Sequence, residues 1–302
     1  MTGPVTETRS GDVVADRSLK RPDGRTVAWT ECGEPTGRVL LRMPGTPGSR
    51  WSIRADRTPW LERGLRVITT ERPGFGASTP LPGRGYAQPS DDVAAVLDEL
   101  GIDDVALIGG SGGGPHVLAF CARHSDRVRA ATVLVGASPL DDDEIDTMID
   151  LNVQASRLAR AGDVEALRAL EEEQRERILA DPLAMFRQIM ATAPTDDQRT
   201  MSDPTWQSAF VRGLTEALGQ GVQGWLDESL VFENGWDEID LPAITTSLTW
   251  WHSDGDRNCP LSAAERFVAR LPNARLEVWT DGGHLTGYHR EGAVLDELLA
   301  RC

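Results

Sequence analysis

A serine in a glycine-rich turn is the first residue of this sequence that could do chemistry. Ser111 lies in the segment GGSGGG at 109–114, between an apolar run at 105–109 and a helical pattern at 115–124. A serine on a sharp strand-to-helix turn has a strained backbone, and flanking glycines remove the clashes of that turn. The helix that follows directs backbone N–H groups at the serine. A phosphate-binding loop, the alternative, needs a Lys–Ser/Thr pair after the glycines, where this chain has Pro115 and His116.

A serine hydroxyl is a poor nucleophile near neutral pH and needs a base. Of the five histidines, His284 lies in a loop directly after the apolar run at 275–279. Loops at the carboxyl ends of strands are where open α/β sheets place function. His116 and His124 lie on the helix after Ser111, and we interpret them as structural or surface residues. His284 is therefore the candidate base.

The base needs a carboxylate that fixes its tautomer and stabilises the imidazolium. Asp254 and Asp256 both follow the apolar run at 244–251, so either could supply it. With Asp256, the order along the chain is nucleophile, acid, base, which is the order of one specific fold.

The elements that must position these residues alternate between strands and helices. Asp23-Gly24 predicts a tight turn within a hairpin over 18–32, and residues 1–16 are expected to be a mobile tail. Short apolar runs predict strands at 39–43, 66–70, 105–109, 130–136, 244–251 and 275–279. Helical spacing predicts helices at 52–63, 89–100, 115–124, 145–161, 164–179, 182–191, 206–218, 261–271 and 290–301. Strands that are apolar throughout and alternate with helices indicate a parallel sheet covered on both faces.

Charge marks one segment of the chain. The 302 residues carry a net charge of −16, and residues 141–240 hold 23 acids against 8 arginines, so they account for −15. We interpret this block as a helical insertion with a solvated surface, in preference to an electrostatic filter against anionic ligands. The overall acidity argues against nucleic acid as a partner.

Other features of the sequence bear on its compartment. No apolar run approaches the ~20 residues of a membrane helix, and the N-terminus has no signal-peptide centre. The four cysteines have no metal-binding or redox spacing. We therefore expect a cytoplasmic protein.

Taken together, these motifs resemble the α/β-hydrolase superfamily. The segment MPGTPG at 43–48 is similar to the family's oxyanion loop, and ERPGFGAS at 71–78 is similar to the loop after its next strand. Asp256, with Pro260 four residues on, matches the acid loop, so we favour Asp256 over Asp254. Gly283-His284 matches the histidine loop. The resemblance implies that the backbone N–H groups of Thr46 and Gly112 form an oxyanion hole.

Three residues depart from the family pattern. Pro44 stands where the family usually has His, Glu71 where it has Asp, and Ser253 where it has Gly. Pro44 lacks the imidazole of a histidine and cannot make a side-chain hydrogen bond. The sequence therefore does not determine how the loop around Gly45 is kept rigid. Glu71 is one methylene longer than the Asp of the family, at a position where the chain turns. We therefore expect the loop at 71–78 to be tilted.

The resemblance implies an α/β-hydrolase core over 1–139 and 241–302, with a helical cap over 140–240. It also implies a serine hydrolase that cleaves an ester, lactone or similar acyl bond of a small apolar substrate, without cofactor or metal. Aromatic cap residues are candidates for the substrate pocket or for packing alone: Trp206, Trp225, Phe186 and Phe210. Alternatives are a C–C bond hydrolase, an aminopeptidase, a repurposed biosynthetic enzyme or a ligand-binding pseudoenzyme. The sequence leaves the oligomeric state undetermined.

Overall fold

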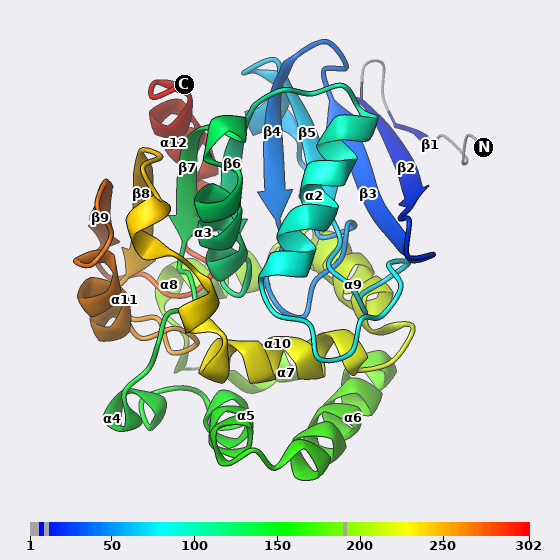
Figure 1. Cartoon of the computed structure of the whole chain (residues 1–302). Coiled ribbons are helices and arrows are strands. Elements are labelled where there is room, and N and C mark those ends of the chain that lie inside the picture. The colour runs from blue at the N-terminus through cyan, green and yellow to red at the C-terminus, as the bar shows by residue number, and fades with distance from the viewer. Residues whose placement is uncertain (1–5, 9–11, 190–191) are drawn as a thin grey trace.

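The chain is built around one twisted sheet. A computed structural model describes residues 6–8, 12–189 and 192–302, and its sheet has nine strands in the order β1-β2-β3-β5-β4-β6-β7-β8-β9 (Figure 1). The strands are β1 (Thr6–Thr8), β2 (Asp12–Lys20), β3 (Thr26–Gly33), β4 (Arg38–Met43), β5 (Leu65–Thr70), β6 (Val105–Gly110), β7 (Val128–Leu134), β8 (Leu248–Ser253) and β9 (Ala274–Trp279). The strands β1, β2, β3 and β5 pair antiparallel in turn, and the pairs from β5 through β9 are parallel. The sheet is therefore mostly parallel, as expected.

Helices cover both faces of the sheet because the parallel strands are apolar on both sides. The helices α2 (Ala87–Glu99), α3 (Gly113–Arg123) and α11 (Leu261–Val268) pack on one face, and α1 (Thr58–Leu61) and α12 (Gly287–Leu299) pack on the other. Successive residues of β6 show the alternation: Leu107 joins the first hydrophobic cluster, while Ala106 and Ile108 join the second.

A long helical segment lies between β7 and β8. Its elements are α4 (Asp142–Ile145), α5 (Asp150–Ala161), α6 (Val164–Ala180), α7 (Ala184–Ile189), α8 (Thr195–Met201), α9 (Pro204–Leu218), α10 (Gln223–Asn234), η3 (Trp236–Glu238) and η4 (Leu241–Ala243). In the part of 140–240 that the structure describes, no strand interrupts them. Figure 1 shows these helices below the carboxyl ends of the parallel strands, the edge of the sheet at which Ser111 follows β6.

The prediction of a mobile tail at the N-terminus is wrong for the residues that the structure describes. Residues 12–16 are not a tail: they begin β2, which pairs with β3 from Ala15 opposite Glu31 to Lys20 opposite Thr26. This pairing confirms the predicted hairpin, but the antiparallel ladder extends further back than the apolar pattern does. Residues 6–8 of the predicted tail are also ordered, since they form β1, which pairs antiparallel with β2 from Thr6 opposite Val14 to Thr8 opposite Asp12. The rest of the predicted tail, 1–5 and 9–11, lies outside the described residues.

The predicted helix over 52–63 is wrong for most of its length, since α1 covers only Thr58–Leu61. The helix begins late because the Asp56 carboxylate accepts the N–H of Thr58 at 3.0 Å and Pro59 occupies the first turn. The predicted helix at 145–161 is divided into α4 and α5, and the sequence prediction missed α8 and α10.

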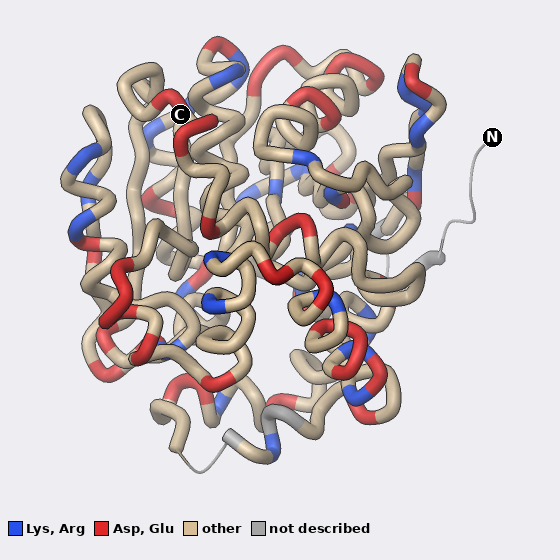
Figure 2. The backbone as a smooth tube through the Cα atoms, turned by 60° about the horizontal axis from the view of Figure 1, so that its bottom comes forward, with Lys and Arg blue, Asp and Glu red and all other residues tan. Residues whose placement is uncertain are grey.

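The acids of the helical segment are not all on a solvated surface. Asp and Glu recur along the whole backbone with Arg and Lys among them (Figure 2). Among the described residues of the segment, five acids are nevertheless buried: Glu144, Glu171, Asp197, Asp227 and Glu228. Two of them bind the loops that surround Ser111. No helix in the described ranges is long and apolar enough to cross a membrane.

Candidate active site

Ser111 lies on a strained turn between β6 and α3. Its φ is 52°, a value that L-residues rarely adopt. The turn is held because the N–H of Ser111 donates to the carbonyl oxygen of Leu134 at 2.9 Å. A Cβ atom on Gly109 would come within 2.6 Å of Val117 Cγ2 and 2.7 Å of the Gly113 carbonyl oxygen, so only glycine fits before the turn. Strain of this kind is concentrated at functional sites.

His284 and Asp256 are brought together across 28 residues of sequence. His284 Nδ1 lies 2.8 Å from Asp256 Oδ2, and Asp256 Oδ1 accepts the N–H groups of Asn258 and Cys259 at 2.7 and 3.1 Å. The Asp256 carboxylate is buried, whereas Asp254 is exposed. The structure thus pairs His284 with Asp256, the carboxylate favoured by the spacing to Pro260.

Electrostatics favour charge on this pair. Burial opposes the imidazolium of His284, but the Asp256 carboxylate outweighs it, so the pKa of His284 lies above its usual value. Burial also opposes ionisation of Asp256, yet His284 and the backbone donors hold the pKa of this carboxyl below its usual value. With Nδ1 turned toward Asp256, the neutral imidazole has its lone pair on Nε2.

Cys259 connects the acid loop to the serine. Burial, with the negative charge of Asp256 acting in the same direction, raises the pKa of the Cys259 thiol well above its usual value, and the Ser111 side chain opposes that rise. The hydroxyl makes no hydrogen bond to His284 within the described part of the chain. The acid loop therefore lies close to both His284 and Ser111.

The loop after β4 lies directly beside Ser111. A Cβ atom on Gly45 would be 3.3 Å from Ser111 Cβ, and one on Gly112 would meet the side chain of Thr46. Neither the Thr46 N–H nor the Gly112 N–H donates a hydrogen bond to any described residue. Two unengaged donors next to a serine match the requirement of an oxyanion hole.

Arg72 replaces the support that a histidine at position 44 could provide. Its guanidinium donates to the carbonyl oxygen of Pro44 at 2.6 Å, to that of Gly45 at 2.9 Å and to Thr46 Oγ1 at 2.9 Å. Arg72 is buried, so these bonds are shielded from water. The guanidinium fork therefore fixes the loop around Gly45.

The Glu71 carboxylate binds both Arg50 and the backbone of the 71–78 loop. It accepts the N–H groups of Arg50, Ala77 and Ser78 at 3.0, 2.7 and 3.2 Å, and it also pairs with the Arg50 guanidinium. The longer side chain thus connects the start of the 71–78 loop to its end.

Glu228 of α10 is the centre of a buried polar cluster that joins the helical segment to the loop at 43–48. It accepts the Thr46 hydroxyl at 2.9 Å, lies 3.2 Å from Arg72 Nε and 3.0 Å from His116 Nε2, and pairs with Arg84. Burial opposes the carboxylate, but the two guanidinium groups and His116 hold the pKa of Glu228 well below its usual value. Burial lowers the pKa of His116 to about 4, so this imidazole is neutral near pH 7. His116 is structural, as the sequence suggested.

The aromatic residues predicted to line a pocket fall into two groups. Trp225 packs on Phe75 and on apolar side chains of α9, within a hydrophobic cluster that joins the helical segment to the 71–78 loop. Trp206 stacks on Phe210, with ring centroids 4.8 Å apart, in a cluster that includes Leu285 next to His284. The side chain of Phe186 lies outside the part that the structure describes.

Sequence reasoning missed Phe232, whose ring lies against the turn that holds Ser111. A Cβ atom on Gly112 would be 2.8 Å from Phe232 Cζ, so the ring of this α10 residue lies against the oxyanion donor. It also missed Asp197 of α8, which binds the histidine loop. The apolar spacing of Leu226 and Leu230 could have indicated α10, but nothing in the sequence marks which of its residues faces Ser111.

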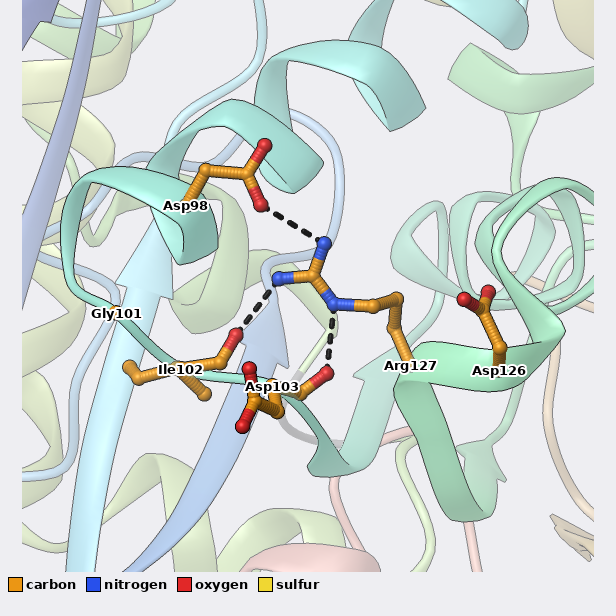
Figure 3. Close-up of a pocket in the computed structure, with 6 residues that line it drawn as sticks. All are labelled: Asp98, Gly101, Ile102, Asp103, Asp126 and Arg127. Atoms are coloured by element: carbon orange, nitrogen blue, oxygen red, sulfur yellow. Dashed lines mark hydrogen bonds and ion pairs between the residues drawn. The ribbon is translucent and has the colours of Figure 1, made fainter.

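A surface hollow at the opposite edge of the sheet has no nucleophile. It lies where α2 ends and β6 and β7 begin, and the Arg127 guanidinium occupies it (Figure 3). Arg127 binds the carbonyl oxygens of Ile102 and Asp103 and, at 2.9 Å, the Asp98 carboxylate. These contacts are structural, and no serine, cysteine or histidine is among the residues that line the hollow.

Comparison with known proteins agrees with this geometry. The pimeloyl-(acyl-carrier protein) methyl ester esterase of Aromatoleum aromaticum is 31% identical over 272 residues, which cover 87% of this chain and 97% of the relative. A non-heme haloperoxidase of Rhodococcus erythropolis is 28% identical and covers 87% of this chain and 90% of its own. The crystal structure of a bromoperoxidase from Bacillus anthracis has the same fold, with a TM-score of 0.70 at 21% identity over 95% of this chain and all of that chain (100%). The sequence profile of the alpha/beta hydrolase fold matches residues 38–289, and the chain belongs to this family.

Proposed function

We propose that this protein is a serine hydrolase that cleaves an ester or similar acyl bond of a small apolar substrate. The observation that carries the proposal is the meeting of Ser111, strained on its turn, with two unengaged N–H groups, those of Thr46 and Gly112. The His284–Asp256 pair supplies a base that is oriented through Nδ1. The esterase of Aromatoleum aromaticum, whose name specifies a methyl ester, supports an ester as the substrate class.

In the first half of the reaction, the Ser111 hydroxyl donates a hydrogen bond to His284 Nε2. The oxygen attacks the carbonyl carbon while Nε2 takes the hydroxyl proton. The negative charge that develops on the carbonyl oxygen is held by the N–H groups of Thr46 and Gly112, each worth about 3–4 kcal/mol in comparable sites. His284 then gives its proton to the leaving oxygen, the ester C–O bond breaks and the alcohol departs.

In the second half, water replaces the alcohol. His284 Nε2 takes a proton from water as the water oxygen attacks the acyl carbon. The bond between the acyl carbon and Ser111 Oγ then breaks, the serine recovers the proton from His284, and the acid leaves. Asp256 stays ionised throughout and stabilises the imidazolium.

We also propose that residues 140–240 act as a cap that shapes the acyl pocket. The position of Phe232 against Gly112 supports this role, as does the Trp206–Phe210 stack beside Leu285. Trp225 has a packing role in this proposal, because its neighbours belong to the interior of the cap and to the 71–78 loop.

A fluorophosphonate probe tests the nucleophile directly. We expect the wild type to be labelled, with mass spectrometry locating the adduct on residue 111, and Ser111→Ala to be unlabelled. Ser125→Ala is the matched control, since Ser125 is an exposed serine after α3. A folded wild type that takes no label would favour a ligand-binding protein over an enzyme.

Esters of p-nitrophenol with acyl chains of rising length test the substrate class. We expect kcat/KM to be highest for uncharged apolar acyl groups. A preference for a charged acyl group would contradict the apolar pocket. Faster hydrolysis of an analogue with a C–C bond or an amide than of the esters would indicate one of the other activities of this fold.

A further inference from the structure

Asp197 of α8 lies against the backbone of the histidine loop, although it is 87 residues before His284 in the chain. Its Oδ1 accepts the N–H of Leu285 at 2.9 Å. The side chain is 7% exposed. A buried carboxylate that accepts backbone N–H groups holds them more strongly than a neutral acceptor does.

The histidine loop is shaped to admit this carboxylate. A Cβ atom on Gly283 would lie 2.6 Å from Asp197 Cγ, so a larger residue there would have to displace the Asp197 carboxylate. On its other side the loop is tied to the acid loop, because the N–H of Gly255 donates to the carbonyl oxygen of Gly282 at 3.0 Å. The loop is therefore held between the acid loop of the core and a helix of the insertion.

The charge on Asp197 also acts on the imidazole. The groups that face His284 are Asp256 from the acid loop, Asp197 from α8 and His252 from β8. Burial opposes the imidazolium, whereas Asp256 and then Asp197 favour it. Burial, and after it the negative charge of Asp256, raises the pKa of Asp197 itself, while its backbone donor and His284 oppose that rise.

We propose that Asp197 is a positioning residue for His284, through which the insertion sets both the place and the basicity of the base. This inference rests on the proposed function. It assigns to the insertion a part in assembling the reaction centre, in addition to covering it. Displacement of α8 from the core would release the amide of Leu285 and remove one of the two carboxylates beside the ring.

The decisive experiment measures the pKa of the His284 imidazole by NMR, with its resonances assigned from the spectrum of His284→Gln. The variants are Asp197→Asn, which keeps the shape and an acceptor for the amide, and Asp196→Asn as the matched control. Asp196 is the preceding residue of α8, carries the same charge and pairs with Arg290 at 3.0 Å, away from the histidine loop.

We expect Asp197→Asn to lower the pKa of His284 by about 0.5–1 unit, since a carboxylate near an imidazolium stabilises its charge. Asp196→Asn should leave His284 unchanged and instead lower the pKa of His289, which Asp196 faces. A His284 pKa that is the same in Asp197→Asn and the wild type overturns the inference. This readout needs no turnover, so it stands apart from the probe labelling that tests the proposed function.

Kinetics on p-nitrophenyl butyrate test the positioning. Asp197→Ala removes the acceptor as well as the charge, and we expect kcat to fall about tenfold with KM nearly unchanged, because a displaced base affects the reacting geometry more than binding. The acidic limb of the pH profile should move to lower pH in both Asp197 variants. A kcat equal to that of the wild type in a folded Asp197→Ala protein would also overturn the inference.

Discussion

Arg72 donates from Nη1 to the carbonyl oxygen of Pro44 at 2.6 Å, and this bond holds the oxyanion loop from behind. The family usually has a histidine at position 44, so a side chain from a different loop provides rigidity that the local sequence lacks. Arg72 Nε lies 3.2 Å from the carboxylate of Glu228 in α10, so the same guanidinium also contacts the insertion.

Replacing Arg72 tests whether the loop depends on this support. Arg72→Lys keeps a positive charge for Glu228 but cannot bind two carbonyl groups and a hydroxyl in one plane. We expect kcat to fall about 10- to 100-fold at nearly constant KM, because misplaced oxyanion donors weaken only the transition state.

Arg84→Lys is the control for that experiment. Arg84 pairs with the same Glu228 carboxylate but makes no contact with residues 44–46. The kcat of this variant should stay near that of the wild type. An equal loss of kcat in the two variants would show that activity depends on the buried charge cluster and not on the support of the loop at Pro44.

The acid can be identified by comparing two neighbouring aspartates. Asp256→Asn should reduce kcat by about 10⁴-fold, because the amide favours the wrong tautomer of the imidazole. Asp254→Asn should have kcat within about twofold of the wild type, as expected for an exposed surface residue. Steady-state rates on one ester suffice, and a large loss in Asp254→Asn would reverse the assignment.

The pH profile of kcat/KM should report the raised pKa of His284. The base acts when neutral, so activity rises with pH as the imidazolium loses its proton. Because burial is outweighed by Asp256 and Asp197, the midpoint should lie above the usual value of 6.5. A profile that is flat or has its midpoint below that value would exclude His284 as the base.

Glu171 of α6 should make the insertion less stable as pH rises. The side chain is fully buried, Oε1 accepts the Ser229 hydroxyl at 2.7 Å, and Oε2 has no partner among the described residues. Burial raises the pKa of Glu171 from 4.5 to about 8. Between these values the unfolded chain has lost the proton while the folded chain keeps it, so the free energy of unfolding decreases as pH increases.

Urea unfolding at about pH 5 and about pH 8.5 measures this effect. The free energy of unfolding of the wild type should fall by about 2–4 kcal/mol more than that of Glu171→Gln, which has no proton to lose. Glu172→Gln changes the same charge on a partly exposed neighbour and should follow the wild type. Identical pH dependence in all three proteins would contradict a proton on Glu171.

Phe232 should set the size of the acyl group. Phe232→Ala removes the ring that lies against Gly112, and we expect the ratio of kcat/KM for long against short acyl esters to rise about tenfold. Leu230→Ala is the control, since Leu230 belongs to α10 but packs in the apolar cluster with Leu167 and Leu226. An unchanged ratio in Phe232→Ala would place the acyl group elsewhere.

Much of the fold could be predicted because its cause is local. The apolar runs of the parallel strands and the glycines around Ser111 are properties of neighbouring residues, and they indicated the sheet and the turn. The tail prediction was wrong at residues 12–16 because β2 gains its stability from pairing with β3, which the local pattern does not record. The absence of α8 and α10 from the prediction has a similar origin, since tertiary packing supplies most of the stability of a short helix.

The sequence by itself determined the family, the strand ends and the residue types able to act as nucleophile, base and acid, since those follow from spacing along the chain. Only the tertiary structure decided that His284 meets Asp256 and not Asp254, that Arg72 supports the loop at Pro44, and that Asp197 binds the histidine loop. Each of these contacts joins segments that are far apart along the chain. The first two depend on how the loops of the core meet at the carboxyl ends of the strands, and the third depends on how α8 of the insertion packs onto the core. Neither composition nor periodicity encodes that packing residue by residue.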